Sequence, residues 1–337
     1  MNREDFENSL IRDDVAEYYL SKTKEEIESE FGPEVSKMVG FKQKNFHHCY
    51  DNLWEHILRT VEGIKSDGLT PEQIKQLRVS AFFHDIGKPD VAKFNERTGQ
   101  QVFYDHAPHS VEIAKPILEK LGYSKQEISK LSFLIGHHDD FISYKTKLEP
   151  FMANHEFIRG INPITVAEKI IENKYDFQAM GYNKDQIRAI CYTLAHGEQP
   201  VFRTRKGPFV IDVDMDEVES KINSGKYNSS YDANIEDYQM LLRLCKADAG
   251  AQAEIVMQGD KKVGSRADKL ENMTNIENSL PEACRILSEK GENEFLNSIL
   301  NLATKKSDLK RQTTQAAQLA TAYENQAPQQ GVSIDNN

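Results

Sequence analysis

Apolar residues recur every three or four positions along much of the chain, a pattern typical of amphipathic helices that pack on a common core. One such helix is predicted over residues 53–64, with His56 at the edge of its apolar stripe. The apolar positions of this helix are Leu53, Trp54, Ile57, Leu58, Val61 and Ile64. A second helix is predicted from Pro71 to about residue 85, because Thr70-Pro71-Glu72-Gln73 has the form of a capping box with proline at the first helical position.

The apolar faces of these helices also carry ionisable side chains. His84 and Asp85 stand side by side at the end of the second helix, and Asp248 shares the inner face of a third predicted helix. The apolar positions of that helix are Tyr238, Leu241, Leu242, Cys245 and Ala249. Burial of such groups costs free energy unless a cation or a full set of hydrogen bonds satisfies them. A His-Asp pair alone is weak evidence, but inward-facing groups on three separate helices favour a metal site over ordinary polar core contacts.

The order of these residues resembles the HD-domain metal-dependent phosphohydrolases: His56, then His84-Asp85 within His-Asp-Ile-Gly-Lys, then Asp248 within Ala-Asp. The closest similarity is to the HD domain attached to bacterial tRNA nucleotidyltransferases, and it covers about residues 46–139 and 235–260. The segments in matching order are Trp54 to Arg59, Phe103 to His106, and the His137-His138 pair. No Gly-Tyr-Pro element follows that pair, which argues against the cyclic-di-GMP phosphodiesterase branch, and the acidic pair typical of guanosine tetraphosphate hydrolases is missing after His84-Asp85.

The resemblance implies an all-α fold, an HD-domain helical bundle with a mixed insertion before the last ligand helix. It also implies a bound metal held by His56, His84, Asp85 and Asp248. Two imidazoles and two carboxylates suit a divalent transition metal such as Mn²⁺, Fe²⁺, Co²⁺ or Zn²⁺ better than Ca²⁺ or Mg²⁺, which prefer oxygen ligands alone.

Enlarged members of the family bind a second metal, with the aspartate of the His-Asp pair bridging the two. His106 and His137 stand where the resemblance places the additional ligands. The helix predicted to begin at Ser124-Lys125-Gln126-Glu127 would instead continue its buried face to His138, so both histidines remain candidates.

Lys88 and Arg59 are the candidate phosphate-binding cations, and Asp85 is a candidate catalytic residue as well as a ligand. Lys88 follows the ligand pair in a turn, where its ammonium could stabilise charge that develops on a phosphoryl oxygen, and Arg59 lies one turn beyond His56. The plain alternative for both is an ordinary surface cation.

The function implied is a phosphatase or phosphodiesterase that acts on a nucleotide or RNA-end phosphate ester through metal-activated hydroxide. The alternative is a catalytically silent HD-fold module that binds a nucleotide or regulates a partner. A complete ligand set with Lys88 intact favours the enzyme, because a silent module has no reason to retain so many costly polar groups in a core.

Composition limits the partners. The chain has 337 residues, 39% of them hydrophobic, and a formal net charge of −11, which argues against broad binding to duplex DNA. Its four cysteines are scattered without metal spacing, as expected for reduced thiols in the cytoplasm. The first residues have no apolar signal core, and no stretch approaches the ~20 apolar residues of a membrane span, so a cytoplasmic location without membrane contact is expected.

Four segments are predicted from the pattern. Residues 1–45 form an N-terminal helical extension that serves as a cap or oligomer contact, and residues 46–260 form the HD phosphohydrolase core with an insertion over about 140–234. Residues 261–304 form C-terminal helices, and residues 305–337 form a low-complexity tail, disordered toward its end.

The insertion is where substrate choice would lie. Within it, helices are predicted at about 164–172 and 184–196, followed by a loop or hairpin near residues 200–211. Arg203, Arg205 and Lys206 in that hairpin could receive the phosphates of a nucleotide, although a solvated hairpin tip is the alternative.

Overall fold

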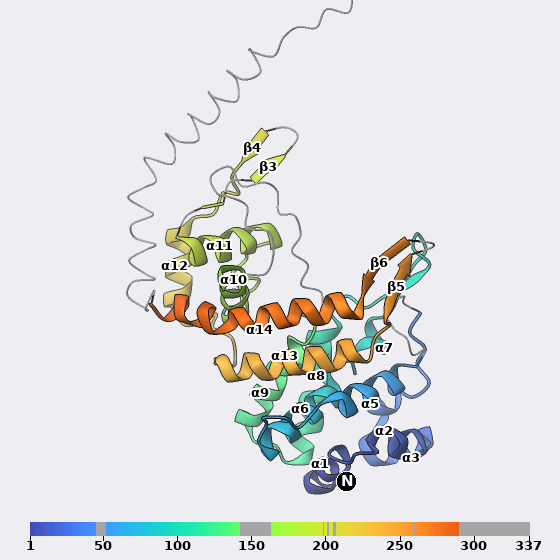
Figure 1. Cartoon of the computed structure of the whole chain (residues 1–337). Helices are drawn as coiled ribbons and strands as arrows, with labels where there is room; N and C mark the ends of the chain where they lie inside the picture. Colours follow the sequence, from blue (N-terminus) through green and yellow to red (C-terminus); the bar gives the residue numbers. More distant parts are fainter. Residues whose placement is uncertain are drawn as a thin grey trace, which may run out of the picture. The chain divides into compact units, whose positions relative to one another are not determined.

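The structure is a computed structural model that describes residues 1–44, 52–141, 163–197, 199–200, 202–204, 207–258 and 261–289. The chain divides into two compact units (Figure 1). Unit 1 comprises Met1–Lys145 with Ser230–Pro281, and unit 2 comprises Thr146–Ser229 with Glu282–Asn337. The fold is mostly helical, which confirms the all-α prediction, and the described strands form three separate two-stranded hairpins.

Unit 1 is a bundle of helices with two small hairpins. Its helices are α1 (Arg3–Leu10), α2 (Val15–Leu20), α3 (Lys24–Phe31), α4 (Pro33–Ser36), α5 (Leu53–Gly63), α6 (Pro71–Phe83), α7 (Lys88–Val91), α8 (His106–Leu121), α9 (Lys125–Gly136) and α13 (Ile235–Gly250). Its hairpins pair β1 (Lys93–Asn95) with β2 (Gln100–Val102), and β5 (Ile255–Gln258) with β6 (Lys261–Ser265). A final helix, α14 (Arg266–Glu289), begins in this unit.

The predicted helix boundaries at Thr70 and Ser124 are confirmed. Both side chains accept a hydrogen bond from the backbone three residues ahead, and the residue at that position returns the bond, so each forms a complete capping box. The predicted end of α6 was two residues too late. The helix ends at Phe83, and residues 84–87 form a turn that separates the His84-Asp85 pair from the helical hydrogen-bond ladder.

Helix α6 is the centre of unit 1, with α5, α9 and α13 packed against it (Figure 1). Near its end the ring of Phe82 contacts, besides the adjacent Phe83, four aromatic rings with centroids 5.3 to 5.9 Å away. We call these residues the aromatic cluster: Phe6, Tyr19, Phe31, Trp54 and Phe82. Because His84 follows Phe82 by two residues, α6 leads directly from an apolar core into the polar pair.

Unit 2 contains α10 (Pro163–Lys174), α11 (Lys184–His196), the hairpin of β3 (Phe202–Thr204) and β4 (Gly207–Phe209), and α12 (Met215–Asn223). The two helices and the hairpin expected in the insertion are therefore present. Phe177, Ile190 and Val218 are among the buried residues of its core. Arg205, Lys206, the Arg203 side chain and the tail from residue 305 lie outside the described part of the chain.

None of the helices in the described ranges combines the length and apolar character needed to cross a lipid bilayer.

Candidate metal centre

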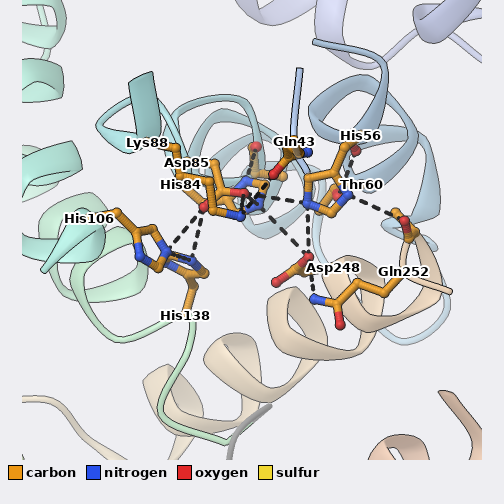
Figure 2. Close-up of polar contacts among 12 residues, drawn as sticks. Gln43, His56, Thr60, His84, Asp85, Lys88, His106, His138, Asp248 and Gln252 are labelled. Carbon is orange, nitrogen blue, oxygen red and sulfur yellow. Dashed lines mark hydrogen bonds and ion pairs between the residues drawn. The ribbon is translucent and has the colours of Figure 1, made fainter. Parts of the chain in front are cut away.

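Six ionisable side chains meet in the interior of unit 1 (Figure 2). They come from α5, the turn after α6, the first residue of α8, the turn after α9, and α13. We call these residues the polar cluster: His56, His84, Asp85, His106, His138 and Asp248. Their exposed fractions range from 0% to 8%, so bulk solvent does little to compensate for their charges.

All four imidazoles of the polar cluster are oriented by backbone carbonyls. The Nδ1 atoms of His84 and His138 lie 2.7 Å from the carbonyls of residues 81 and 135. Those of His106 and His56 lie 2.8 and 3.3 Å from the carbonyls of residues 103 and 251. Because a carbonyl can only accept, each Nδ1 must donate, and every ring therefore presents its Nε2 atom to the centre. This orientation is common for imidazoles that bind a metal.

The two carboxylate oxygens of Asp85 divide the histidines into two sets. Oδ2 lies 3.4 and 3.2 Å from the Nε2 atoms of His56 and His84. Oδ1 lies 3.2 and 3.4 Å from the Nε2 atoms of His106 and His138. A single carboxylate thus faces two imidazole pairs, as a bridging ligand between two metals would.

Asp248 completes the first set. Its Oδ1 atom lies 3.1 Å from His56 Nε2 and 3.9 Å from His84 Nε2. The same oxygen accepts a hydrogen bond from the Gln252 amide at 3.2 Å, one helical turn further along the chain. This second contact holds the carboxylate in place without occupying its other oxygen.

The charges in the polar cluster strongly perturb one another. Burial alone would raise the pKa of Asp85 and Asp248, but nearby histidines, and Lys88 in the case of Asp85, hold both values well below the usual range. Burial alone would lower the pKa of His56, but Asp248 and Asp85 raise it to about 9. His138 behaves in the same way, since Asp139 and Asp85 raise its pKa to about 9 against burial. Protons on these rings balance the carboxylates until a cation replaces them, so metal binding must release protons.

The donor set fits a divalent transition metal. His84 Nε2 and Asp85 Oδ1 are buried and form no hydrogen bond with any part of the chain that the structure describes. The Nε2 atoms of His106 and His138 lie 3.2 Å apart, a separation that needs a proton or a cation to offset the repulsion of their lone pairs. Imidazole nitrogens with carboxylate oxygens suit Mn²⁺, Fe²⁺, Co²⁺ or Zn²⁺.

Close packing after α6 brings α8 to Asp85. A side chain on Gly87 would place its Cβ 2.8 Å from the carbonyl oxygen of His106 and the backbone nitrogen of Ser110, so only glycine fits there. The Gly87 backbone also donates to the Ser110 hydroxyl at 2.9 Å. Just before α8, Asp105 adopts the left-handed region with φ 60°, which turns the chain so that His106 opens the helix.

Lys88, the candidate phosphate-binding cation, lies beside the polar cluster. Its side chain is buried, and its Nζ atom lies 2.6 Å from Asp85 Oδ2. The ammonium also lies 5.4 Å from the centre of the Phe103 ring, which covers it.

Of the two candidate histidines, the structure brings His138 and not His137 into the polar cluster. Helix α9 ends at Gly136, and His137 turns outward, with 28% of its side chain exposed and its Nδ1 atom 2.9 Å from Asp140. His138, one residue later, continues the buried face. The periodicity of α9 was therefore a better guide than the family alignment.

Arg59 lies outside the polar cluster, and its role as a phosphate-binding cation stays a prediction. Its guanidinium lies 2.9 Å from Glu17 and 3.0 Å from Glu62, and it takes no part in the polar cluster of the described structure. Instead it lines a cavity of about 460 Å³ between α5 and α13. The other basic residues in that lining are Lys65, Arg243 and Lys246.

Four residues near the polar cluster were missed by the sequence reasoning. Gln252 follows Asp248 by one turn, and Cys245, one turn before it, donates its thiol to the His138 carbonyl at 2.9 Å. Helical spacing from Asp248 could have indicated both. Asp139 lies 3.2 Å from His106 Nε2, and its position after the His-His pair was the available signal. For Gln43 the sequence offered no such signal, because no periodic pattern of apolar residues surrounds it.

Comparison with known proteins confirms the resemblance. Residues 53–194 match the HD domain family profile, and HD domains are in general metal-dependent phosphohydrolases. The matched range contains His56, His84-Asp85, His106 and His138 and ends before Asp248.

Two similar relatives are both tRNA nucleotidyltransferases. The CC-adding enzyme of Thermus thermophilus is 33% identical over 115 residues, which is 34% of this chain and 26% of the relative. The A-adding enzyme of Deinococcus radiodurans is 25% identical over 144 residues, covering 38% of this chain and 32% of the relative. The similarity thus spans about a quarter to a third of each relative's length.

Proposed function

We propose that this HD domain, completed by Asp248 from α13, is a metal-dependent phosphohydrolase that cleaves a phosphate ester on a nucleotide or RNA end. One observation carries the proposal: backbone carbonyls orient four imidazoles so that their Nε2 atoms surround the two oxygens of Asp85. A structural polar contact would not need four rings fixed in this way.

The residues that would hold metal form two overlapping sets. His56, His84, Asp85 and Asp248 would hold one ion, and Asp85, His106 and His138 would hold a second. A divalent pair supplies Lewis-acid activation of the attacking water and neutralises charge on the phosphate ester.

Lys88 is the proposed catalytic cation. The contact of its ammonium with Asp85 fixes it beside the ligands, and its burial keeps it from bulk solvent. In such a low-dielectric site a fixed positive charge stabilises the charge that develops on a phosphoryl oxygen in the transition state. Lys88 therefore acts mainly on turnover rather than on metal binding.

Two observations support a nucleotide or RNA-end substrate. The relatives named above act on tRNA, and the cavity between α5 and α13 offers a basic surface next to the metal ligands. Lys65 and Arg243 face that cavity and form no ion pair with the residues of the described ranges. The floor of the cavity includes Ala251, whose carbonyl contacts His56, so a chain of phosphates held there would lie close to the polar cluster.

A substrate screen tests the proposal. Purified protein loaded with Mn²⁺, Fe²⁺, Co²⁺ or Zn²⁺ is assayed with nucleoside monophosphates, 2′,3′-cyclic nucleotides and short RNAs that carry terminal phosphates. We expect release of phosphate or opening of a phosphodiester. In Lys88→Ala we expect turnover to fall by roughly 10²-fold with the metal still bound, because the lost interaction strengthens in the transition state.

The matched control is Lys115→Ala, which removes an exposed lysine from α8 and should leave turnover unchanged. Full activity in Lys88→Ala would refute the catalytic role of that residue. Nucleotide binding without any product, at every metal and pH, would support a silent binding module instead.

A further inference from the structure

Gln43 reaches the polar cluster from outside the matched HD domain range (Figure 2). Its segment is held on both sides by backbone hydrogen bonds. Leu53 N donates to the Phe41 carbonyl at 2.8 Å, which ties the segment to the start of α5. Gln101 N donates to the Lys44 carbonyl at 2.8 Å, which ties it to β2. The Gln43 side chain is therefore placed by two separate elements, and it is only 4% exposed.

The orientation of the Gln43 amide follows from its neighbour. Lys88 Nζ donates to Gln43 Oε1 at 3.4 Å. An ammonium has donors only, so the amide oxygen must face it and the amide nitrogen must point away. That nitrogen is buried and has no hydrogen-bond partner among residues 1–44, 52–141 and the other described ranges.

A buried amide nitrogen without an acceptor destabilises the folded protein, and such groups in native structures call for an explanation. A glutamine that served only to orient Lys88 would need its oxygen alone. An oxygen of a ligand that arrives beside the buried ammonium and the polar cluster would supply this acceptor. Phosphoryl oxygens meet both conditions, because they accept hydrogen bonds and carry negative charge.

We propose that Gln43 is a substrate-binding residue whose amide N–H donates to a non-bridging oxygen of the phosphoryl group, with Lys88 holding the same group. The inference rests on the proposed function and adds to it a residue that neither the HD domain match nor the metal ligand set contains. Gln43 and Lys88 then form a pair of adjacent donors, one neutral and one charged, next to Asp85. The ligand class is a phosphate monoester or the phosphate anion released from it.

Equilibrium binding of inorganic phosphate to the Mn²⁺-loaded full chain tests this inference without turnover. Gln43→Met keeps the length of the side chain but removes both the N–H donors and the oxygen that accepts from Lys88. We expect its Kd for phosphate to rise by about 10- to 100-fold, as for the loss of a charge-assisted hydrogen bond. Metal content should not change, and the thermal midpoint of the phosphate-free protein should change little, because the removal of an unmet buried donor offsets the loss of the long contact with Lys88, which keeps its ion pair with Asp85.

A purely structural glutamine predicts the opposite pattern. A lower thermal midpoint with an unchanged Kd for phosphate in Gln43→Met would overturn the inference. Gln43→Glu is the second variant, since it retains an oxygen that faces Lys88 but has no N–H. We expect its Kd to rise as well, and an unchanged Kd would again contradict the inference. Gln178→Met, on the surface of unit 2, controls for the substitution itself.

The two proposals fail in different ways. Phosphate binding that depends on Gln43, in a protein that hydrolyses no ester, would refute the proposed function and leave this inference standing. Conversely, a protein that hydrolyses esters but whose Kd for phosphate is the same in Gln43→Met would support the proposed function and refute this inference.

Discussion

The aromatic cluster and the polar cluster lie at the same end of α6, two residues apart in sequence, yet they differ in how they are stabilised. In the aromatic cluster, Phe82 contacts four rings, and only the Trp54 indole nitrogen lacks a hydrogen bond to the described residues. Such a core is stable through burial and ring packing alone. In the polar cluster, four histidines and two aspartates face one another away from bulk solvent, and bound protons or a cation balance their charges. One region is complete as folded, and the other is built for a ligand.

The largest expected effect is on the polar cluster. Asp85→Asn removes the charge that both imidazole sets share, so we expect the metal content to fall from about two ions per chain to none. Added metal should raise the thermal midpoint of the wild-type protein, by mass action, and leave that of the variant unchanged. Elemental analysis and thermal unfolding provide the measurements. A variant that retains both ions would show that Asp85 is not their shared ligand.

The next effect concerns the aromatic cluster. Phe82→Ala should lower the free energy of unfolding by about 3–5 kcal/mol, because it removes a ring from a closely packed site and leaves a cavity. Chemical denaturation measures this loss. Metal content per folded chain should stay the same, since the aromatic rings that Phe82 contacts belong to core residues and not to the candidate ligands. A loss of metal in folded Phe82→Ala would show that the two clusters depend on each other.

A smaller effect concerns the charged residues near the aromatic cluster. Arg3 lies 2.7 Å from both Glu7 and Glu127, and its contact holds the pKa of Glu127 at about 2. A carboxylate whose pKa is depressed in the folded protein stabilises the fold at pH values above its pKa in the unfolded chain. This contribution is lost as the pH falls toward the depressed pKa. At neutral pH the free energy of unfolding of the wild-type protein should therefore exceed that of Arg3→Met by about 1 kcal/mol, a small value because the ion pairs are partly exposed.

This difference should shrink as pH falls from 4.5 toward 2, the interval between the ordinary and the depressed pKa of Glu127. Denaturation of both proteins across that range gives the measurement. A difference that is constant with pH would mean that the Arg3 contribution comes from its packing on the Tyr123 ring rather than from its charge.

The sequence predicted the parts of this structure that depend on local pattern. Capping boxes at Thr70 and Ser124 marked helix starts correctly, and inward-facing His56 and Asp248 revealed the polar cluster. What it could not predict depends on chain geometry after a helix ends. The direction of His137 and His138 is set by the turn that follows Gly136.

Contacts between segments distant in the sequence could not be predicted from the sequence pattern either. Arg59 lies one turn from His56, but Glu17 and Glu62 hold its guanidinium away from the polar cluster. Gln43 approaches Lys88 only because backbone pairing with α5 and β2 fixes its segment. The proposed boundaries of the four segments and the phosphate role of the hairpin cations remain predictions.

The most direct test of the central claim, that the polar cluster is a two-metal site shared by Asp85, is the metal content of two adjacent histidine variants. We expect about two ions per chain in the wild-type protein, about one in His138→Ala, and about two in His137→Ala, whose ring contacts Asp140 instead. The variants differ by one position, so they share any general effect on α9. No bound metal in the wild-type protein after reconstitution with Mn²⁺, Fe²⁺, Co²⁺ or Zn²⁺, or a loss in His137→Ala but not in His138→Ala, would contradict the account.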